Sequence, residues 1–143
     1  MRRRDQRGQT TLLIVGLCVV AMLLIGVVVD ASAAYLRHSG LDSLADGAAL
    51  AAADGIQGRQ VYEGGLTERA EIDPLVARAL VGEYLEAGTA AQRYPGLSYR
   101  VDARTDRVVV RVAAPLDLPI APPGWSGRPV ITSTAASLVV VSQ

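Results

Sequence analysis

The sequence predicts an α+β fold: a long N-terminal transmembrane helix that continues outside the membrane, a second helix and a small antiparallel β-sheet. Three observations predict it. An uncharged apolar run lies near the N-terminus, helical spacing of apolar residues continues beyond it, and the later chain alternates apolar and polar residues as half-buried strands do. The expected divisions are a basic cytoplasmic tail (1–11), the transmembrane helix (12–29), its extramembrane continuation (30–54), a Gly-rich linker (55–72) and an extracytoplasmic α+β domain (73–143).

The apolar run at residues 12–29 has the length of a transmembrane helix. At about 1.5 Å per residue it reaches roughly 27 Å, close to the thickness of about 30 Å of a bilayer's hydrocarbon core. The alternative is a secretory signal cleaved after Ala33, because a basic segment precedes the run and Ala31-Ser32-Ala33 is a small-x-small motif. The run is longer than the usual signal, and Asp30 just before the motif is unusual, which favours the span.

The charge on the two sides of the span predicts the orientation. Four arginines and one aspartate give +3 before it, whereas residues 31–143 carry ten arginines and twelve acids, or −2. The positive-inside rule therefore places the N-terminus in the cytoplasm and the C-terminal domain outside. Cys18, the only cysteine, lies within the span, so it can form no intramolecular disulfide and we interpret it as an apolar filler.

The helix is expected to continue past the membrane. Leu41, Leu44, Ala48 and Ala51 recur at helical spacing, and Asp54-Gly55 predicts its end at a left-handed glycine cap. A second set of small residues recurs every fourth position and would let another element approach closely. This ridge, formed by Ala45, Ala49 and Ala53, packs either on the chain's own sheet or on a partner helix.

The first 55 residues or so resemble the N-terminal segment of TadE/TadG-like proteins of the Flp (tight adherence) pilus machinery. The resemblance rests on Arg7-Gly8, the apolar run, Asp30, and the block LADGAALAAA at residues 44–53. Leu44 and Gly47 depart from a pattern in which alanine is usual. The family-motif and helix-packing residues are Gly8, Asp30, Tyr35, Arg37, Leu41, Leu44, Ala45, Asp46, Ala49 and Ala53.

The resemblance implies a pilin-like, single-pass protein of the bacterial inner membrane. Its partners would be membrane lipid and other pilus-assembly or pilin-like proteins, contacted through helix packing. Prepilin-type processing in related pilins follows a glycine and favours an acid five positions later, but Gly8 is followed there by Leu13. Asp30 is expected at the outer membrane boundary or, within an assembly, paired with a neighbour's cation.

The outside domain begins with a predicted helix. Asp73 has the character of an N-cap, Pro74 suits the first helical position, and Gly88 ends the helix after Ala87. The apolar stripe is expected at Val76, Leu80 and Tyr84, with Leu75 and Leu85 alongside.

Beyond a turn at Tyr94-Pro95-Gly96, two strands form a predicted hairpin with residues 103–106 as its loop. Val101 and Val108 must face the same side, which leaves two registers. We expect Asp102 opposite Arg107, because the competing register places Arg100 against Arg111.

Five prolines between residues 115 and 129 predict an extended surface loop, and residues 130–141 predict a third strand. Trp125 lies in this loop. It either folds back onto the chain's own core or is a candidate partner contact.

No constellation of residues predicts catalysis. His38 is the only histidine, no cysteine lies outside the span, and Glu83 and Glu86 are spaced as acids that solvate a helix face. The slightly acidic outside part does not suit nucleic acid. We expect a non-enzyme without cofactor, metal or small-molecule substrate: a minor pilin-like subunit or assembly factor of a Flp/Tad-type pilus or related secretion system. The alternative is a small secreted binding domain released after Ala33.

Overall fold

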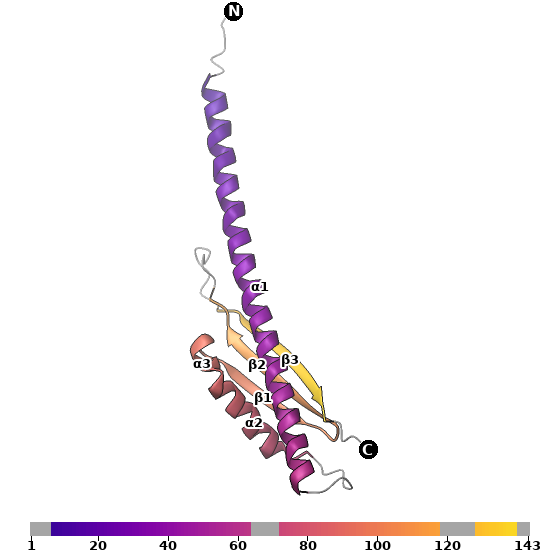
Figure 1. Cartoon of the computed structure of the whole chain (residues 1–143). Coiled ribbons are helices and arrows are strands. Elements are labelled where there is room, and N and C mark those ends of the chain that lie inside the picture. The colour runs from indigo at the N-terminus through magenta and orange to yellow at the C-terminus, as the bar shows by residue number, and fades with distance from the viewer. Residues whose placement is uncertain (1–6, 64–71, 118–127, 140–143) are drawn as a thin grey trace, which may run out of the picture. The chain divides into compact units, whose positions relative to one another are not determined.

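The computed structural model describes residues 7–63, 72–117 and 128–139. It contains a long N-terminal apolar helix, further helices and a three-stranded antiparallel sheet, which confirms the predicted α+β class (Figure 1). The described residues divide between two compact units. One holds the helix up to Tyr35, and the other holds everything described from Leu36 onward.

Helix α1 runs from Arg7–Glu63 without interruption. The predicted end at Gly55 is wrong, because Gly55 lies within the helix. Leu80 packs against Gly55, and the next residue, Ile56, is buried in the core. Tertiary contacts therefore hold the helix together where the local sequence favours a break, and the expected linker does not begin at residue 55.

Helix α2 spans Pro74–Ala87, as predicted. The Asp73 carboxylate accepts a hydrogen bond of 2.8 Å from the Leu75 N–H, which satisfies one of the free donors of the first turn. At the other end the Gly88 N–H donates to the Tyr84 carbonyl at 3.0 Å. The cap residues thus determined both ends of this helix.

The buried stripe of α2 is rotated by one position from the predicted one. Its core-facing residues are Ala77, Val81 and Leu85. Val76 and Leu80 of the predicted stripe are half-buried and pack against the core, whereas Tyr84 is exposed. Leu80 and Tyr84 also contact glycines of α1. The spacing of bulky residues therefore identified the flank of the core-facing side and not its centre.

A short helix, α3, spans Ala90–Arg93 and was not predicted. The predicted turn that follows it is confirmed. The Leu97 N–H donates to the Tyr94 carbonyl at 3.0 Å, and Gly96 has a φ of 79°. Proline before a residue with positive φ is the arrangement of a type II turn.

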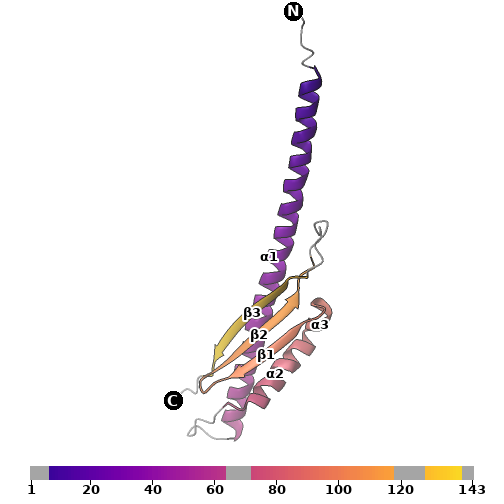
Figure 2. The same ribbon diagram turned by 180° about the vertical axis from the view of Figure 1, so that it is seen from behind.

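Strands β1 (Ser98–Ala103), β2 (Arg107–Pro115) and β3 (Val130–Leu138) form one antiparallel sheet in the order β1-β2-β3. The predicted facing of the strands is confirmed, since Val108, Val110 and Val112 are fully buried. They belong to one cluster with residues of α1 and α2, so both helices cover the same face of the sheet. Figure 2 shows the opposite, uncovered face in front of α1.

The predicted hairpin register is wrong. Arg100 lies opposite Arg111, and Asp102 lies opposite Val109. The hairpin closes more tightly than expected, with the Arg104 N–H donating to the Arg107 carbonyl at 2.9 Å. Both registers bury the same valines, so a tight turn outweighs an exposed charge pair, which contributes only about 0.2 to 1 kcal/mol.

The proline-rich segment differs from its prediction at both ends. Pro115 is the last residue of β2 and lies opposite Val130, and the Leu116 N–H donates to the Pro129 carbonyl at 2.7 Å. Pairing therefore extends into residues expected to form a loop. Residues 118–127, including Trp125, and residues 140–143 at the end of the expected third strand lie outside the described residues.

Candidate functional site

The apolar run of α1 is exposed along its whole length. Its large side chains, from Leu12 to Val29, are between 44% and 76% exposed. In the part of the chain that the structure describes, α1 is the one helix long and apolar enough to cross a membrane. So much exposed apolar surface requires an apolar environment, and it fits a membrane-anchored protein.

The structure separates the family-motif residues into two groups. Leu41, Ala45, Ala49 and Ala53 are buried in the chain's own domain. The other described side chains of the motif are half-buried or exposed: Asp30, Tyr35, Arg37, Leu44 and Asp46. Gly8 lies in the first turn of α1. The alanine ridge is thus occupied by its own domain, which leaves the exposed residues for any partner.

Glycines of α1 receive side chains from the rest of the domain. A β-carbon at Gly40 would collide with the Tyr94 hydroxyl, and one at Gly47 would collide with the Tyr84 hydroxyl. At Gly55 a β-carbon would lie 2.8 Å from a methyl carbon of Leu80. These contacts link residues far apart in sequence, and sequence reasoning missed them because each glycine's partner lies on another element.

Arg37 lies over the ring of Tyr94, with its guanidinium carbon 5.7 Å from the ring centroid. Its Nε and Nη2 atoms are buried and have no hydrogen-bond partner among the described residues. A cation held over an aromatic face is favourable, but buried donors without acceptors are costly. The guanidinium of Arg37 therefore contributes little net stability to the fold.

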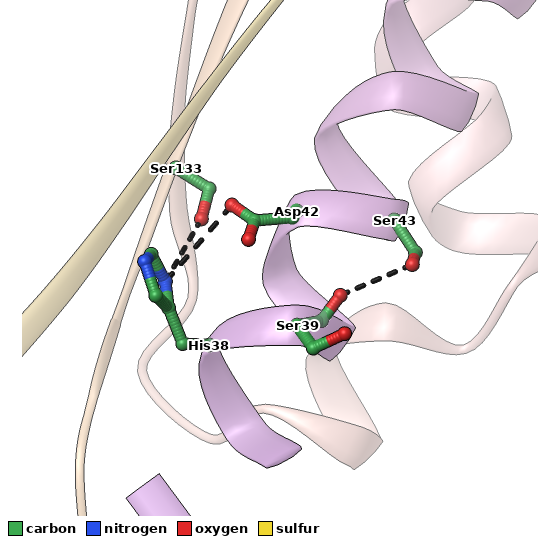
Figure 3. Close-up of polar contacts among 5 residues, drawn as sticks. All are labelled: His38, Ser39, Asp42, Ser43 and Ser133. Atoms are coloured by element: carbon green, nitrogen blue, oxygen red, sulfur yellow. Dashed lines mark hydrogen bonds and ion pairs between the residues drawn. The ribbon is translucent and has the colours of Figure 1, made fainter. Parts of the chain in front are cut away.

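His38, Asp42 and Ser133 come together where α1 passes β3 (Figure 3). The Ser133 hydroxyl lies 3.5 Å from His38 Nδ1, and a carboxylate oxygen of Asp42 lies 3.9 Å from the same nitrogen. In a catalytic triad the serine and the acid contact different ring nitrogens. Ser133 is also only 3% exposed, so the set connects a helix to a strand and does not present a nucleophile.

Sequence reasoning singled out His38 but missed Ser133, which is ninety-five positions away in the chain. The contacts within α1 are simpler. Ser43 donates to the Ser39 carbonyl at 3.0 Å, which is a common way for a helical serine to satisfy its hydroxyl (Figure 3).

An open groove of about 470 Å³ runs between α2 and the edge strand β1. Glu83 and Glu86 lie on it beside Arg78, above apolar surface from Leu75 and Tyr99. Among the described residues no group of three or more metal-ligating side chains comes together. Glu83 and Glu86 are both exposed, as expected of acids that solvate a helix face.

Comparison with known proteins supplies one match. The model of the Flp pilus-assembly TadE/G-like family matches residues 8–55, which confirms the resemblance seen in the motif. No curated protein and no solved structure matches the chain. The match includes both the exposed apolar run and the buried alanine segment of α1. Residues 8–55 are therefore similar to the TadE/G-like Flp pilus-assembly family, and this similarity supports a Tad pilus-related role.

Proposed function

We propose that the chain is a minor pilin-like subunit or assembly factor of a Flp/Tad-type pilus or related secretion system. The observation that carries this proposal is the extent of the family match. Residues 8–55 include both the apolar run of α1 and the part of the same helix that packs into the folded domain. Such a protein holds a domain at the membrane and offers its helix to neighbours. Its partners are lipid and other pilus-assembly proteins.

The proposed location is the bacterial inner membrane, with the N-terminus in the cytoplasm and the α+β domain outside. The arginine-rich N-terminal segment supports this orientation, because positively charged segments stay on the cytoplasmic side. Residues 30–54 then leave the membrane as helix, and the domain that starts near residue 73 completes the fold around them.

The proposed role is structural and not enzymatic. The His38 set lacks triad geometry, and the pilus-assembly family itself suggests such a role. Nothing in this proposal needs a cofactor, a small-molecule substrate or nucleic acid.

Deletion and complementation in the native cell test the function. We expect a strain without the protein to lose surface pili, and the wild-type chain to restore them. A chain with Leu17→Arg and Leu24→Arg is the matched variant and should not restore the pili. Two charges in the apolar run weaken membrane insertion by about 2.5 to 3.5 kcal/mol each. Normal pili in the deletion strain would contradict the proposal.

Intact mass spectrometry of the protein from native membranes tests the anchor. We expect the apolar run to remain in the mature chain. A chain that begins at Ala34 would show that the run is a cleaved signal and would support the secreted alternative. A chain that begins at Gln9 would show prepilin-type processing.

The role of Asp30 is tested separately. We propose that it lies at the membrane boundary or pairs with a cation from a neighbour. Asp30→Asn keeps the shape and removes the charge. If this variant gave wild-type abundance and pilus number, a pairing role for the charge would be excluded.

A further inference from the structure

One side of α1 carries an acidic stripe that faces away from the domain's own core. We define the acidic stripe as Asp46, Leu50 and Asp54, which lie four residues apart and hence on one side of the helix. All three are exposed, and Leu50 is 55% exposed although it is apolar. Within the described residues, neither aspartate takes part in an ion pair.

The uncovered face of the sheet carries three arginines and one exposed acid, Asp102, which lies opposite Val109, so its balance is positive. We define the basic face as Arg100, Arg107, Val109 and Arg111. Arg100 lies directly opposite Arg111, and both are exposed, although opposed like charges destabilise a sheet. Arg111 donates from Nε to the Thr134 hydroxyl at 3.3 Å, and no acid of the described residues pairs with either arginine. Among the described residues, Arg107 forms an ion pair with its neighbour Asp106 alone, at 2.8 Å.

The two surfaces match in spacing as well as in charge. Eight helical residues separate the aspartates of the acidic stripe, about 12 Å along the axis. Four strand residues separate Arg107 from Arg111, about 14 Å along β2. Each surface has an apolar side chain at its midpoint, Leu50 on the helix and Val109 on the strand. An acid-apolar-acid pattern thus meets a base-apolar-base pattern of nearly equal length.

The acidic stripe and the basic face lie on opposite sides of one domain, since the sheet contacts α1 through its other face. A contact between them is heterologous and repeats from copy to copy. It also keeps every α1 parallel, which anchors in one membrane require. His38 contacts Ser133, which lies opposite Val112, so the N-terminal end of this part of α1 is nearer to Arg111 than to Arg107.

We propose that copies of this chain stack head to tail, with the acidic stripe of one copy lying across the basic face of the next. Asp46 faces the Arg100 and Arg111 pair, Leu50 packs on Val109, and Asp54 faces Arg107. The partner is a second copy of this chain. The inference rests on the proposed function, because it names the partner of a membrane-anchored assembly protein.

Disulfide cross-linking of the full chain in native membranes tests the contact. In a Cys18→Ser background, a chain with Leu50→Cys and Val109→Cys should form a ladder of dimers, trimers and larger species on oxidation. Each single-cysteine chain should form no ladder. The matched control joins Leu50→Cys to Glu86→Cys, which is exposed on α2, and should give about one-tenth of the product or less.

Charge reversal tests the pairing itself. Arg111→Glu should reduce the ladder about fivefold, and adding Asp46→Arg should restore it. The same charge change placed at Glu86→Arg should not restore it. Because all these residues are exposed, thermal unfolding should stay close to that of the parent, which separates loss of contact from loss of fold.

Three outcomes would overturn the stacking. These are cross-linked dimers without larger species, a failure of Asp46→Arg to restore the ladder, and a Leu50→Cys adduct with a different protein. Pilus counts in the deletion strain keep this separate from the proposed function. Pili that need the protein while no ladder forms would reject stacking alone, and a ladder with normal pili in the deletion strain would reject the pilus role alone.

Discussion

At the scale of single residues, glycine in α1 provides room for tyrosine. Gly40 receives the Tyr94 hydroxyl and Gly47 receives the Tyr84 hydroxyl, so a missing side chain on the helix is matched by a large one elsewhere. Glycine in a helix costs up to about 1 kcal/mol relative to alanine. The close approach offsets this cost by allowing α1 and the remaining elements to enclose a common core.

Gly40→Ala should therefore destabilise the domain by about 1 kcal/mol, because Tyr94 is only 7% exposed and cannot swing away. Gly58→Ala is the control. Apart from its chain neighbours and the backbone of its own helix, no described atom lies within 4 Å of the added carbon, so helix propensity should stabilise the domain by up to about 1 kcal/mol. Tyr94→Phe combined with Gly40→Ala should recover most of the loss. Chemical denaturation measures all three, and equal effects at both glycines would contradict the argument.

Gly47→Ala should cost less than Gly40→Ala. Its clash is with Tyr84, which is 37% exposed and can turn toward solvent at a cost of about 1 kcal/mol or less. The same denaturation experiment compares the two sites. A larger loss at Gly47 would show that Tyr84 is held more firmly than its exposure indicates.

Arg37→Met should leave the domain as stable as the parent or raise its unfolding free energy by about 1 kcal/mol. The change removes a cation–π contact worth about 0.5 to 1 kcal/mol. It also removes two buried donors that have no partner among the described residues, which cost about 1 to 3 kcal/mol. Arg37→Ala is the comparison and should lose packing on Tyr94. A marked loss of stability in Arg37→Met would show that the guanidinium has an acceptor in the folded protein.

At the scale of elements, the helix ends and the buried strand face that depend on neighbouring residues were predicted correctly. Asp73 and Gly88 predicted both ends of α2, and the alternating valines of β2 predicted which face is buried. The end of α1 and the hairpin register were missed, because contacts across the fold decide them. Leu80 packing on Gly55 extends the helix, and closure of the turn at Arg104 and Arg107 sets the register.

The candidate site was predictable to the same extent. The apolar run and the family motif can be read from the sequence, whereas the division of that motif into buried and exposed residues cannot. Ala45 and Ala49 are buried while Asp46, between them, is exposed, and this depends on where the sheet lies. The direct pairing of Arg100 with Arg111 in the basic face was missed for a related reason. It exists only in the register that charge repulsion had argued against.

The hairpin should show a measurable pH dependence. The hydrogen bond from Arg107 holds the pKa of Asp106 below its ordinary range. Because the folded-state pKa is depressed, the stabilisation is present above the pKa of the unfolded chain. It is lost as the pH falls through the folded-state pKa. Carboxyl NMR titration should place Asp106 low in the parent and higher in Arg107→Gln.

Arg104→Gln is the matched control for this titration. Arg104 acts on Asp106 only through a weaker charge interaction, so its loss should raise the pKa of Asp106 by less than the loss of Arg107 does. Equal shifts in the two variants would show that the hydrogen bond is not the main cause.

At the scale of the whole molecule, one helix serves two environments. Before residue 30 its large apolar side chains are exposed, as lipid requires, and from Leu41 onward its small and medium side chains form the core of a folded domain. The entire buried cluster lies between Leu41 and Ala135. The apolar run contributes nothing to that core, so anchoring and folding are separable properties of the chain.

A fragment of residues 36–143 should therefore fold without detergent. It keeps every residue of the buried cluster, the Arg37 and Tyr94 contact and the link from His38 to Ser133, and it removes the exposed apolar surface. Circular dichroism should show helix and sheet with one cooperative thermal transition, and the Gly40→Ala variant should lower that transition while Gly58→Ala should not. A fragment that aggregates or unfolds without cooperativity would show that residues before Leu36 are needed for the fold.

A fragment that starts at residue 49 is the matched control. It lacks Leu41, Ala45 and Ala48, three members of the cluster, and the loss of these buried side chains should abolish the cooperative transition.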